Sequence, residues 1–281
     1  MNEKALIMQL ETLVQQIGDH LMSMPRSRPL VAGVSGGQGV GKTTFCKALS
    51  QYLSDAGVAT LSVSLDNFYL SRRERETLGA HIHPLCQTRG VPGTHNVGQL
   101  NEVMVALRLK HRIADVRLPV FSKSLDDVLP PAQWLSVQTQ PEIILLEGWC
   151  VGAQADFISP HPQTEWERTH DGDGVWKQWS QTQAAAYADI WAACECLVLM
   201  RQDNFEAIID SRWAQEQDNA AASGVWQFET REDVAQFCAH YESWTLGMWH
   251  ALPSKCDFVI GRDETFTYRH WLDEPSPHRL S

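Results

Sequence analysis

The apolar residues of this chain recur with periods that predict alternating helices and strands. Between residues 6 and 21 they fall at steps of three and four, which predicts an amphipathic helix that docks on the rest of the protein. Prolines follow, so we expect this N-terminal helix to occupy residues 1–25. An apolar run at 30–34 predicts a buried strand, a helical period at 45–53 a second helix, and alternation at 61–65 a second strand.

The order strand, helix, strand in these segments is a βαβ unit, and such units form parallel sheets. Further apolar runs extend the pattern along the chain. They predict strands at 116–118, 143–146, 196–200 and 258–260 and a helix at 97–107. The predicted fold class is therefore α/β, with a mostly parallel sheet flanked by helices.

Two helix starts are predicted in the second half of the chain. Asp203 with Glu206, and Thr230 with Asp233, have the spacing of capping boxes ahead of apolar positions. The helix after Thr230 is expected to reach Met248, because its apolar positions continue that far.

Composition narrows the class of protein. The chain has 281 residues, of which 43% are hydrophobic, so it can bury a sizeable core, and its net charge is −11. This acidic balance argues against general nucleic-acid binding. The sequence has neither an apolar run of membrane-spanning length nor the apolar core of a signal peptide, so we expect no membrane partner.

The seven cysteines are dispersed and contain no Cys-x-x-Cys pair, which favours a reducing, cytoplasmic compartment over a disulfide scaffold. Residues 159–174 are rich in Pro, His and Asp and are predicted to form a loop or insertion. We see no repeat and no low-complexity linker. We therefore expect one elaborated α/β domain over residues 1–281.

A phosphate-binding motif follows the first predicted strand. The residues Gly36-Gly-Gln-Gly-Val-Gly-Lys42-Thr43 match G-x-x-x-x-G-K-[ST], between a buried strand and an amphipathic helix. Glycines let several backbone N–H groups aim at one point, and the helix N-terminus adds a positive dipole. The nucleotide-binding residues that we predict are Gly36, Gly37, Gln38, Gly39, Val40, Gly41, Lys42, Thr43 and Thr44.

The motif predicts a P-loop NTPase fold, with Lys42 on the β- and γ-phosphates and the Thr43 hydroxyl on Mg²⁺. Guanine specificity usually needs an Asn/Thr-Lys-x-Asp step after a buried strand. The nearest match, at 254–257, precedes its apolar run instead. ATP is therefore the favoured nucleotide.

Two acids follow predicted strands, at the edge where parallel sheets bind ligands. Asp66 could accept the proton of a substrate hydroxyl, or it could simply cap the following helix. Glu147 suits the task of holding Mg²⁺ or its water shell; the alternative is an exposed strand-end acid.

Together these residues resemble the uridine kinase, phosphoribulokinase and pantothenate kinase group of P-loop kinases. The stretches that carry the resemblance are the phosphate motif, Leu65-Asp-Asn-Phe-Tyr69 and Leu146-Glu-Gly148. Further stretches are similar to the D-glycerate 3-kinase branch. These are Arg89-Gly-Val-Pro-Gly-Thr-His-Asn96, Pro119-Val-Phe-Ser-Lys-Ser-Leu-Asp-Asp127, Glu147-Gly-Trp-Cys-Val-Gly152, Asp171-Gly-Asp-Gly-Val-Trp176 and Arg201-Gln-Asp-Asn through Arg212-Trp213.

The resemblance implies specific roles. Lys42 would clamp the phosphates, Asp66 would be the catalytic base, and Thr43 and Glu147 would attend the metal. Residues toward the acceptor would be Arg89, Thr94, His95 and Lys123.

The resemblance also implies a lid. Arg212 would lie on this helical lid and meet the transferring phosphoryl group, within a kinase core at 30–262 and a lid and following helix at about 203–250. Without the resemblance, Arg212 would be an exposed helix residue paired with Glu216, and Lys123 an isolated surface lysine. The chain departs from the family at Asn67, where a second Asp is frequent, which leaves metal preference open.

The function that these patterns favour is ATP- and Mg²⁺-dependent transfer of the γ-phosphate to a hydroxyl of a small acceptor, D-glycerate first. The alternatives are another small acceptor, such as a nucleoside, pantothenate or a sugar, and a P-loop ATPase that acts on a protein partner. Charge weakly favours an acidic acceptor such as a hydroxy-acid. Residues 66–123 carry nine Lys and Arg against five Asp and Glu, whereas residues 124–281 carry nine against 25.

Overall fold

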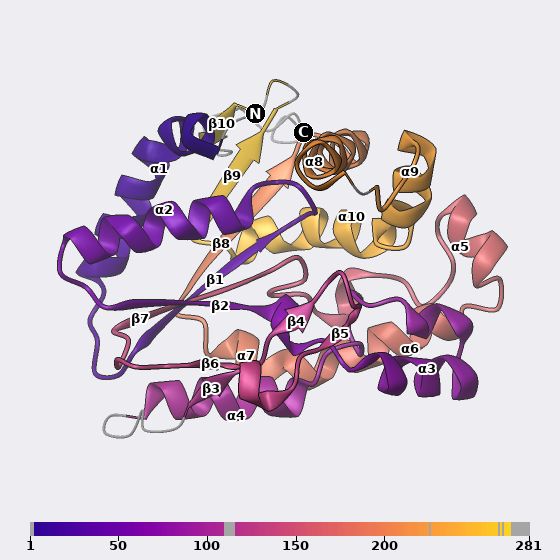
Figure 1. The fold of residues 1–281 in the computed structure, drawn as a ribbon, viewed down its shortest axis with the longest axis horizontal. Helices are drawn as coiled ribbons and strands as arrows, with labels where there is room; N and C mark the ends of the chain where they lie inside the picture. The colour runs from indigo at the N-terminus through magenta and orange to yellow at the C-terminus, as the bar shows by residue number, and fades with distance from the viewer. Residues whose placement is uncertain (1–2, 110–115, 225, 264, 266, 271–281) are drawn as a thin grey trace, which may run out of the picture.

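A six-stranded sheet forms the centre of the protein (Figure 1). The computed structural model describes residues 3–109, 116–224, 226–263, 265 and 267–270. The strands are β1 (Leu30–Gly36), β2 (Thr60–Ser64), β7 (Ile143–Gly148), β8 (Cys196–Gln202), β9 (Phe258–Arg262) and β10 (Tyr268–His270). Their order is β10-β9-β8-β1-β7-β2, and only the β10–β9 pairing is antiparallel. The predicted mostly parallel sheet is confirmed.

Helices cover both faces of this sheet (Figure 1). Side chains that alternate along each strand enter two different cores. In β7, for example, Ile143 and Leu145 pack on the side of α1 (Glu3–Ser23) and α2 (Lys42–Asp55), whereas Ile144 and Leu146 face the opposite core. Buried on both faces, the central strands read as continuous apolar runs in the sequence, as parallel strands usually do.

The other elements build the opposite core and surround the end of the sheet that carries the phosphate loop. The helices are α3 (Arg72–His81), α4 (Val97–Arg108), α5 (Glu165–His170), α6 (Val175–Gln183), α7 (Ala188–Ala192), α8 (Glu206–Ser223), α9 (Arg231–Ala239) and α10 (Glu242–Ala251). Two small antiparallel pairs join β3 (Arg117–Leu118) to β6 (Leu135–Ser136) and β4 (Phe121–Ser122) to β5 (Asp127–Val128). In the described part of the chain, no helix combines the length and apolar character that crossing a bilayer requires.

One of the two predicted capping boxes is confirmed and the other is wrong. Thr230 and Asp233 cap α9 reciprocally, as expected. At the start of α8, however, the Asn204 side chain accepts from the N–H of Ala207 at 2.9 Å. The carboxylate of Asp203 is drawn away by Arg269, 3.1 Å distant on β10, so a distant cation outcompetes the local cap.

Three other segments differ from the predictions. The helix expected from Thr230 to Met248 is interrupted, because α9 ends before Tyr241 and α10 starts after it. The predicted loop at 159–174 contains the short helix α5, which starts with a capping box between Thr164 and Glu167. Strand β10 was not predicted from its sequence.

The N-terminal helix packs on α2. Ile17 is buried between the two helices, and Gly18 lies so close to Tyr52 that an added Cβ would come within 2.4 Å of its ring. The Tyr52 hydroxyl also donates to Asp19 at 2.7 Å. The amphipathic helix predicted from its periodicity is thus part of the folded body.

Substituting Ile17→Ala should therefore lower the free energy of unfolding by about 2–5 kcal/mol, since it leaves a cavity between two helices. Urea denaturation followed by tryptophan fluorescence and circular dichroism measures this change. Gln16→Ala, on the exposed side of the same helix, is the matched control and should change stability by less than about 0.5 kcal/mol. Equal effects of the two substitutions would contradict the docking of α1.

Candidate active site

The phosphate motif forms a tight loop between β1 and α2. Gly39 and Gly41 have φ of 71° and 96°, in the left-handed region that favours glycine. A Cβ on Gly36 would come within 2.4 Å of the Met200 carbonyl oxygen, so the close approach of β8 also requires glycine. These constraints hold the predicted nucleotide-binding loop at the carboxyl end of β1.

Lys42 begins α2 and turns back over the loop. Its Nζ donates to the Gly37 carbonyl at 3.0 Å. Burial lowers the pKa of the Lys42 ammonium, and the negative charges of Glu147 and Asp66 oppose this shift. The lysine and both predicted acids therefore lie close enough for their charges to interact. Thr43 is exposed on the first turn of α2.

Strand register brings the two acids to this edge. Glu147, buried near the end of β7, stands opposite Val34 of β1 on one side and Ser64 of β2 on the other. Asp66 follows β2 within a short 3₁₀ turn, Leu65–Phe68, whose N-cap is Ser64. Ser71 caps the following helix α3, so Asp66 is not the helix cap that was its alternative role.

The carboxylate of Asp66 is held by two side chains. Tyr69 donates its hydroxyl to Oδ1 at 3.0 Å, and the Nζ of Lys123 lies 2.7 Å from Oδ2. Burial acts to raise the pKa of Asp66, but the charges of Lys123 and Lys42 and the hydrogen bond from Lys123 lower it below its usual value. The structure therefore holds an ionised carboxylate beside the phosphate loop.

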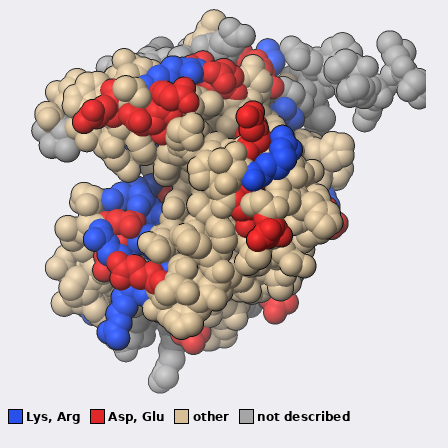
Figure 2. Space-filling model, turned by 90° about the vertical axis from the view of Figure 1, so that its right-hand side faces the viewer, with Lys and Arg blue, Asp and Glu red and all other residues tan. Residues whose placement is uncertain are grey.

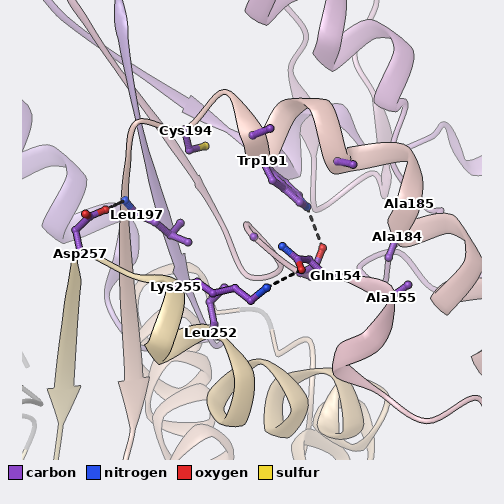
Figure 3. Close-up of a pocket in the computed structure, with 14 residues that line it drawn as sticks. Gln154, Ala155, Ala184, Ala185, Trp191, Cys194, Leu197, Leu252, Lys255 and Asp257 are labelled. Carbon is purple, nitrogen blue, oxygen red and sulfur yellow. Dashed lines mark hydrogen bonds between the residues drawn. The ribbon is translucent and has the colours of Figure 1, made fainter. Parts of the chain in front are cut away.

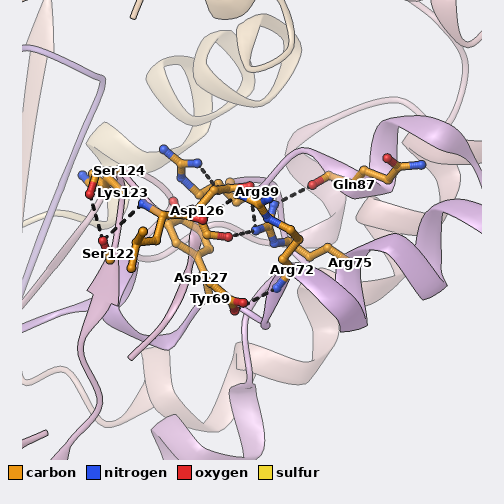
Figure 4. Close-up of polar contacts among 12 residues, drawn as sticks. Tyr69, Arg72, Arg75, Gln87, Arg89, Ser122, Lys123, Ser124, Asp126 and Asp127 are labelled. Atoms are coloured by element: carbon orange, nitrogen blue, oxygen red, sulfur yellow. Dashed lines mark hydrogen bonds and ion pairs between the residues drawn. The ribbon is translucent and has the colours of Figure 1, made fainter. Parts of the chain in front are cut away.

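Lys123 reaches Asp66 from the β4–β5 hairpin. Arg75 anchors this hairpin (Figure 4). Arg75 is 2% exposed and donates to three main-chain carbonyls, those of Leu70, Gln87 and Asp126. Its guanidinium also lies 2.9 Å from the Asp126 carboxylate. Arg75 of α3 is thus a buried anchor that joins this hairpin to the body of the protein.

Arg89 shares this network. Its guanidinium pairs with the carboxylate of Asp126 and lies 5.5 Å from the ring centre of Phe121. The Asn67 amide oxygen accepts from the N–H of Phe121 at 3.2 Å, so the residue that departs from the family pattern supports the hairpin. Arg89, Lys123 and Asp66 are therefore brought to one region, and the binding of an acceptor there stays a prediction.

The other two predicted acceptor residues lie deeper. Thr94 is fully buried, and its hydroxyl accepts from the N–H of Gly90 and donates to the Val91 carbonyl, both at 2.8 Å. In the structure this hydroxyl closes the turn formed by residues 90–94. His95 stacks on Tyr69 with 4.5 Å between ring centres, which places it next to the residue that holds Asp66.

His95 is neutral at physiological pH. Burial lowers the pKa of its imidazole to about 4, although the charge of Asp66 acts in the opposite direction. Its Nδ1 lies 2.8 Å from the Tyr187 hydroxyl, which also accepts from the N–H of Gly93 at 3.2 Å. Its Nε2 is buried without a hydrogen-bond partner within the described protein. Tyr187 was not predicted, because only the fold brings it beside His95.

Arg212 lies on α8, which packs against the phosphate loop: a Cβ on Gly39 would come within 2.9 Å of Ser211. The Arg212 guanidinium donates to Glu216 at 3.0 Å and to Gln227 at 3.2 Å. In this structure it makes the local pairing that the sequence alone suggested, and its contact with a phosphoryl group stays a prediction.

Charge is divided across the face of the molecule that Figure 2 shows. This is the right-hand side of Figure 1, toward which the carboxyl ends of β1 and β2 point. Acidic side chains gather on its upper part, over α8 and α9, whereas Lys and Arg mix with acids on its lower part, with a hollow between them. The basic residues of α3 contribute to this lower part of the surface.

A separate cavity of about 460 Å³ lies near the start of β8 and β9, at the opposite edge of the sheet from the phosphate loop (Figure 3). Its polar side chains bind one another or the main chain. Lys255 donates to Gln154, the Trp191 indole donates to the Ala153 carbonyl, and Asp257 accepts from a backbone N–H. Nothing in this lining indicates a ligand.

Comparison with known proteins agrees with this geometry. No protein-family model matches the chain. The uncharacterized kinase mug58 of Schizosaccharomyces pombe is 29% identical over 245 residues, which cover 83% of this chain and 86% of that protein. The chloroplastic D-glycerate 3-kinase of Arabidopsis thaliana is 26% identical over 243 residues, 82% of this chain but only 50% of that protein. Bacterial pantothenate kinases match over less than half of the chain.

The fold is similar to that of D-glycerate 3-kinase from Cryptococcus neoformans, with a TM-score of 0.67, 21% identity, and 92% of this chain and 99% of that chain covered. The chain therefore has the fold of the P-loop kinases. Its homologues and structural neighbours are kinases, with pantothenate kinases and D-glycerate 3-kinases among them.

The buried histidines predict a loss of stability in mild acid. Burial lowers the pKa of His95 to about 4 and that of His240 to about 3, against 6.5 for an unperturbed histidine. Between pH 6.5 and 4 these two histidines are protonated in the unfolded chain but mostly neutral in the native protein. The free energy of unfolding therefore falls as pH falls. Each histidine should contribute a loss of about 2 kcal/mol between pH 7.5 and pH 5.

Urea denaturation at several pH values measures this slope. His95→Gln keeps a neutral polar side chain. It should reduce the loss of unfolding free energy between pH 7.5 and pH 5 by the contribution of one histidine, about 2 kcal/mol. His161→Gln, at an exposed position, is the control and should leave the slope unchanged. A wild-type stability that is flat between pH 7.5 and 5 would contradict the prediction.

Proposed function

We propose that this chain is an ATP- and Mg²⁺-dependent kinase that transfers the γ-phosphate to a hydroxyl of a small hydroxy-acid, with D-glycerate as the first candidate. The observation that carries the proposal is the ionised Asp66 carboxylate beside Lys42 and the phosphate loop, with Lys123 at 2.7 Å. Kinase homologues support the phosphotransferase class, and two D-glycerate 3-kinases support the acceptor.

In this mechanism the protein mainly positions reactants and stabilises charge. Backbone N–H groups of the loop and Lys42 hold the phosphates. Asp66 accepts the hydrogen bond, and finally the proton, of the attacking hydroxyl. Because Lys123 holds Asp66 in its ionised form, an incoming hydroxyl meets an acceptor that is ready to take its proton.

The residues present fit a Mg²⁺ ion. The Thr43 hydroxyl and the Glu147 carboxylate are oxygen ligands, which Mg²⁺ prefers. No group of three or more His, Cys, Asp or Glu in the described part of the chain could hold a metal by itself. The ion would therefore share its shell with phosphates and water, as Mg²⁺ usually does at nucleotide sites. When bound, it would neutralise phosphate charge.

The acceptor side suits an anion. Arg89 and Lys123 place two cations near Asp66, and each is already paired with a carboxylate of the protein, Asp126 and Asp66 respectively. An acceptor carboxylate could replace Asp126 on Arg89 because Asp126 retains its bond to Arg75. Burial lowers the pKa of the His95 imidazole to about 4, so this residue adds a neutral polar group at physiological pH.

Closure would come from the helices above the loop. We propose that α8 and α9 form the lid, which carries Arg212 toward the transferring phosphoryl group and excludes water. This motion requires Arg212 to leave Glu216 and Gln227, its partners in this structure.

Two alternatives remain for the reaction. Pantothenate kinases among the relatives favour a kinase of another small acceptor. A P-loop ATPase that acts on a protein would hydrolyse ATP without any acceptor. Purified protein with ATP-Mg²⁺ and a panel of hydroxy-acids, nucleosides, pantothenate and sugars separates the three by ADP release and product mass.

Asp66→Asn should lower kcat for the preferred acceptor by about 10²–10⁴-fold, because the amide cannot take the proton. Asp55→Asn makes the same chemical change at the far end of α2 and should leave kcat unchanged. Near-normal transfer by Asp66→Asn would reject the assignment of the base, and ATP consumption without acceptor would favour the ATPase.

Arg89→Met should raise KM for a carboxylate acceptor by about 10–100-fold, the range expected when a charge-assisted hydrogen bond is lost. KM for ATP should stay within twofold. Arg73→Met, on the exposed side of α3, is the control. An Arg89 variant with an unchanged acceptor KM would remove the carboxylate from the proposed acceptor site.

A further inference from the structure

Three distant side chains hold three successive carbonyl oxygens of the phosphate loop. Gln202 Nε2 donates to the carbonyl of Gln38 at 3.1 Å, and Tyr268 Oη donates to that of Val40 at 2.8 Å. Between them, an Nη of Arg262 donates to the carbonyl of Gly39. The three donors lie 164, 223 and 228 positions from their acceptors in the chain.

These donors form one row across the sheet. Gln202 ends β8 and is the register partner of Arg262, which ends β9; Arg262 in turn pairs with Tyr268, the first residue of β10. Neighbouring strands lie about 4.8 Å apart and successive Cα atoms about 3.8 Å apart, so a row of strand ends can match consecutive peptides of a loop that runs across it.

The three side chains are almost fully enclosed, with exposures of 1% for Gln202, 3% for Arg262 and 7% for Tyr268. Water cannot easily replace a donor lost from such a place, so the carbonyl that loses it would stay unsatisfied. Arg262 also donates to Ser211 at 3.2 Å, which connects the same row to α8.

Holding a carbonyl also aims an N–H group. In a trans peptide, the C=O of one residue and the N–H of the next point in opposite directions, and the described chain contains no cis peptide. Carbonyls 38, 39 and 40 are drawn toward the row, so the N–H groups of residues 39, 40 and 41 face away from it. The left-handed Gly39 and Gly41 allow these groups to line one concavity, although the Val40 N–H also makes a long 3.4 Å contact with Gly37.

We propose that Gln202, Arg262 and Tyr268 are positioning residues that set the phosphate-binding loop in its anion-accepting conformation. The inference rests on the proposed nucleotide-binding function and adds residues that the phosphate motif does not contain. Its consequence is specific: loss of a donor should weaken binding of the phosphate chain and leave recognition of the nucleoside and the acceptor intact.

The test uses the full chain and isothermal titration with ADP and with inorganic tripolyphosphate. Tyr268→Phe removes one hydroxyl and keeps the ring. We expect Kd for both probes to rise by about 5–50-fold. The double variant Tyr268→Phe, Gln202→Met, which removes a second donor at similar volume, should bind both probes more weakly still.

Tyr52→Phe is the matched control. It removes a hydroxyl that donates to Asp19 between α1 and α2, so both dissociation constants should stay within twofold. KM for the acceptor provides a second control. A residue that only stabilised the whole fold would change KM for ATP and KM for the acceptor together or leave both unchanged, whereas we expect KM for the acceptor alone to stay unchanged. Arg262→Lys should recover more binding than Arg262→Met, since the ammonium can still donate to the loop.

Wild-type affinity of the folded Tyr268→Phe and double variants for both probes would overturn the inference, even if their free energy of unfolding had fallen. The proposed function fails differently. A wild-type protein that bound neither ADP nor tripolyphosphate would refute nucleotide binding itself, together with the inference that depends on it.

Discussion

Parallel pairing of β2, β7 and β1 is the constraint on which the candidate site depends. In this register Glu147 stands level with both Val34 and Ser64, so the phosphate loop, Glu147 and Asp66 leave the sheet at one edge. A shift of one residue in β7 would turn Glu147 to the other face of the sheet. It would also move the apolar side chains of β7 into the core on the opposite side. Because β1 and β7 are buried on both faces, such a shift would require the cores on both sides of the sheet to repack.

The charged groups at this edge depend on one another. Asp126 has φ of 53°, a conformation that costs a non-glycine residue about 1–3 kcal/mol. It persists because its carboxylate joins Arg75 and Arg89 and because Arg75 also binds its carbonyl. The same anchor sets the hairpin from which Lys123 reaches Asp66. Substitutions in the buried part of this network would therefore act on the site without touching a reactant.

Local signals predicted most of the elements but fewer of their contacts. Periodicity located α1, α2 and the central strands, and the Thr230 capping box located α9, because these features depend on neighbours a few residues away. The Asp203 box failed because Arg269 attracts the carboxylate from another strand. Nothing local in the sequence distinguishes a solvated arginine from Arg75, which is buried under a hairpin whose Asp126 lies 51 positions away.

By itself, the sequence determined the class of this protein: a glycine-rich motif between a strand and a helix has few structural solutions, and acids after apolar strands must lie at one sheet edge. The tertiary structure alone decided how those residues are held. Lys123 pairs with Asp66, Tyr187 contacts His95, and three strand ends bind the loop carbonyls through hydrogen bonds that span up to 228 positions. Such contacts arise from strand order and register, and no local pattern of residues encodes them.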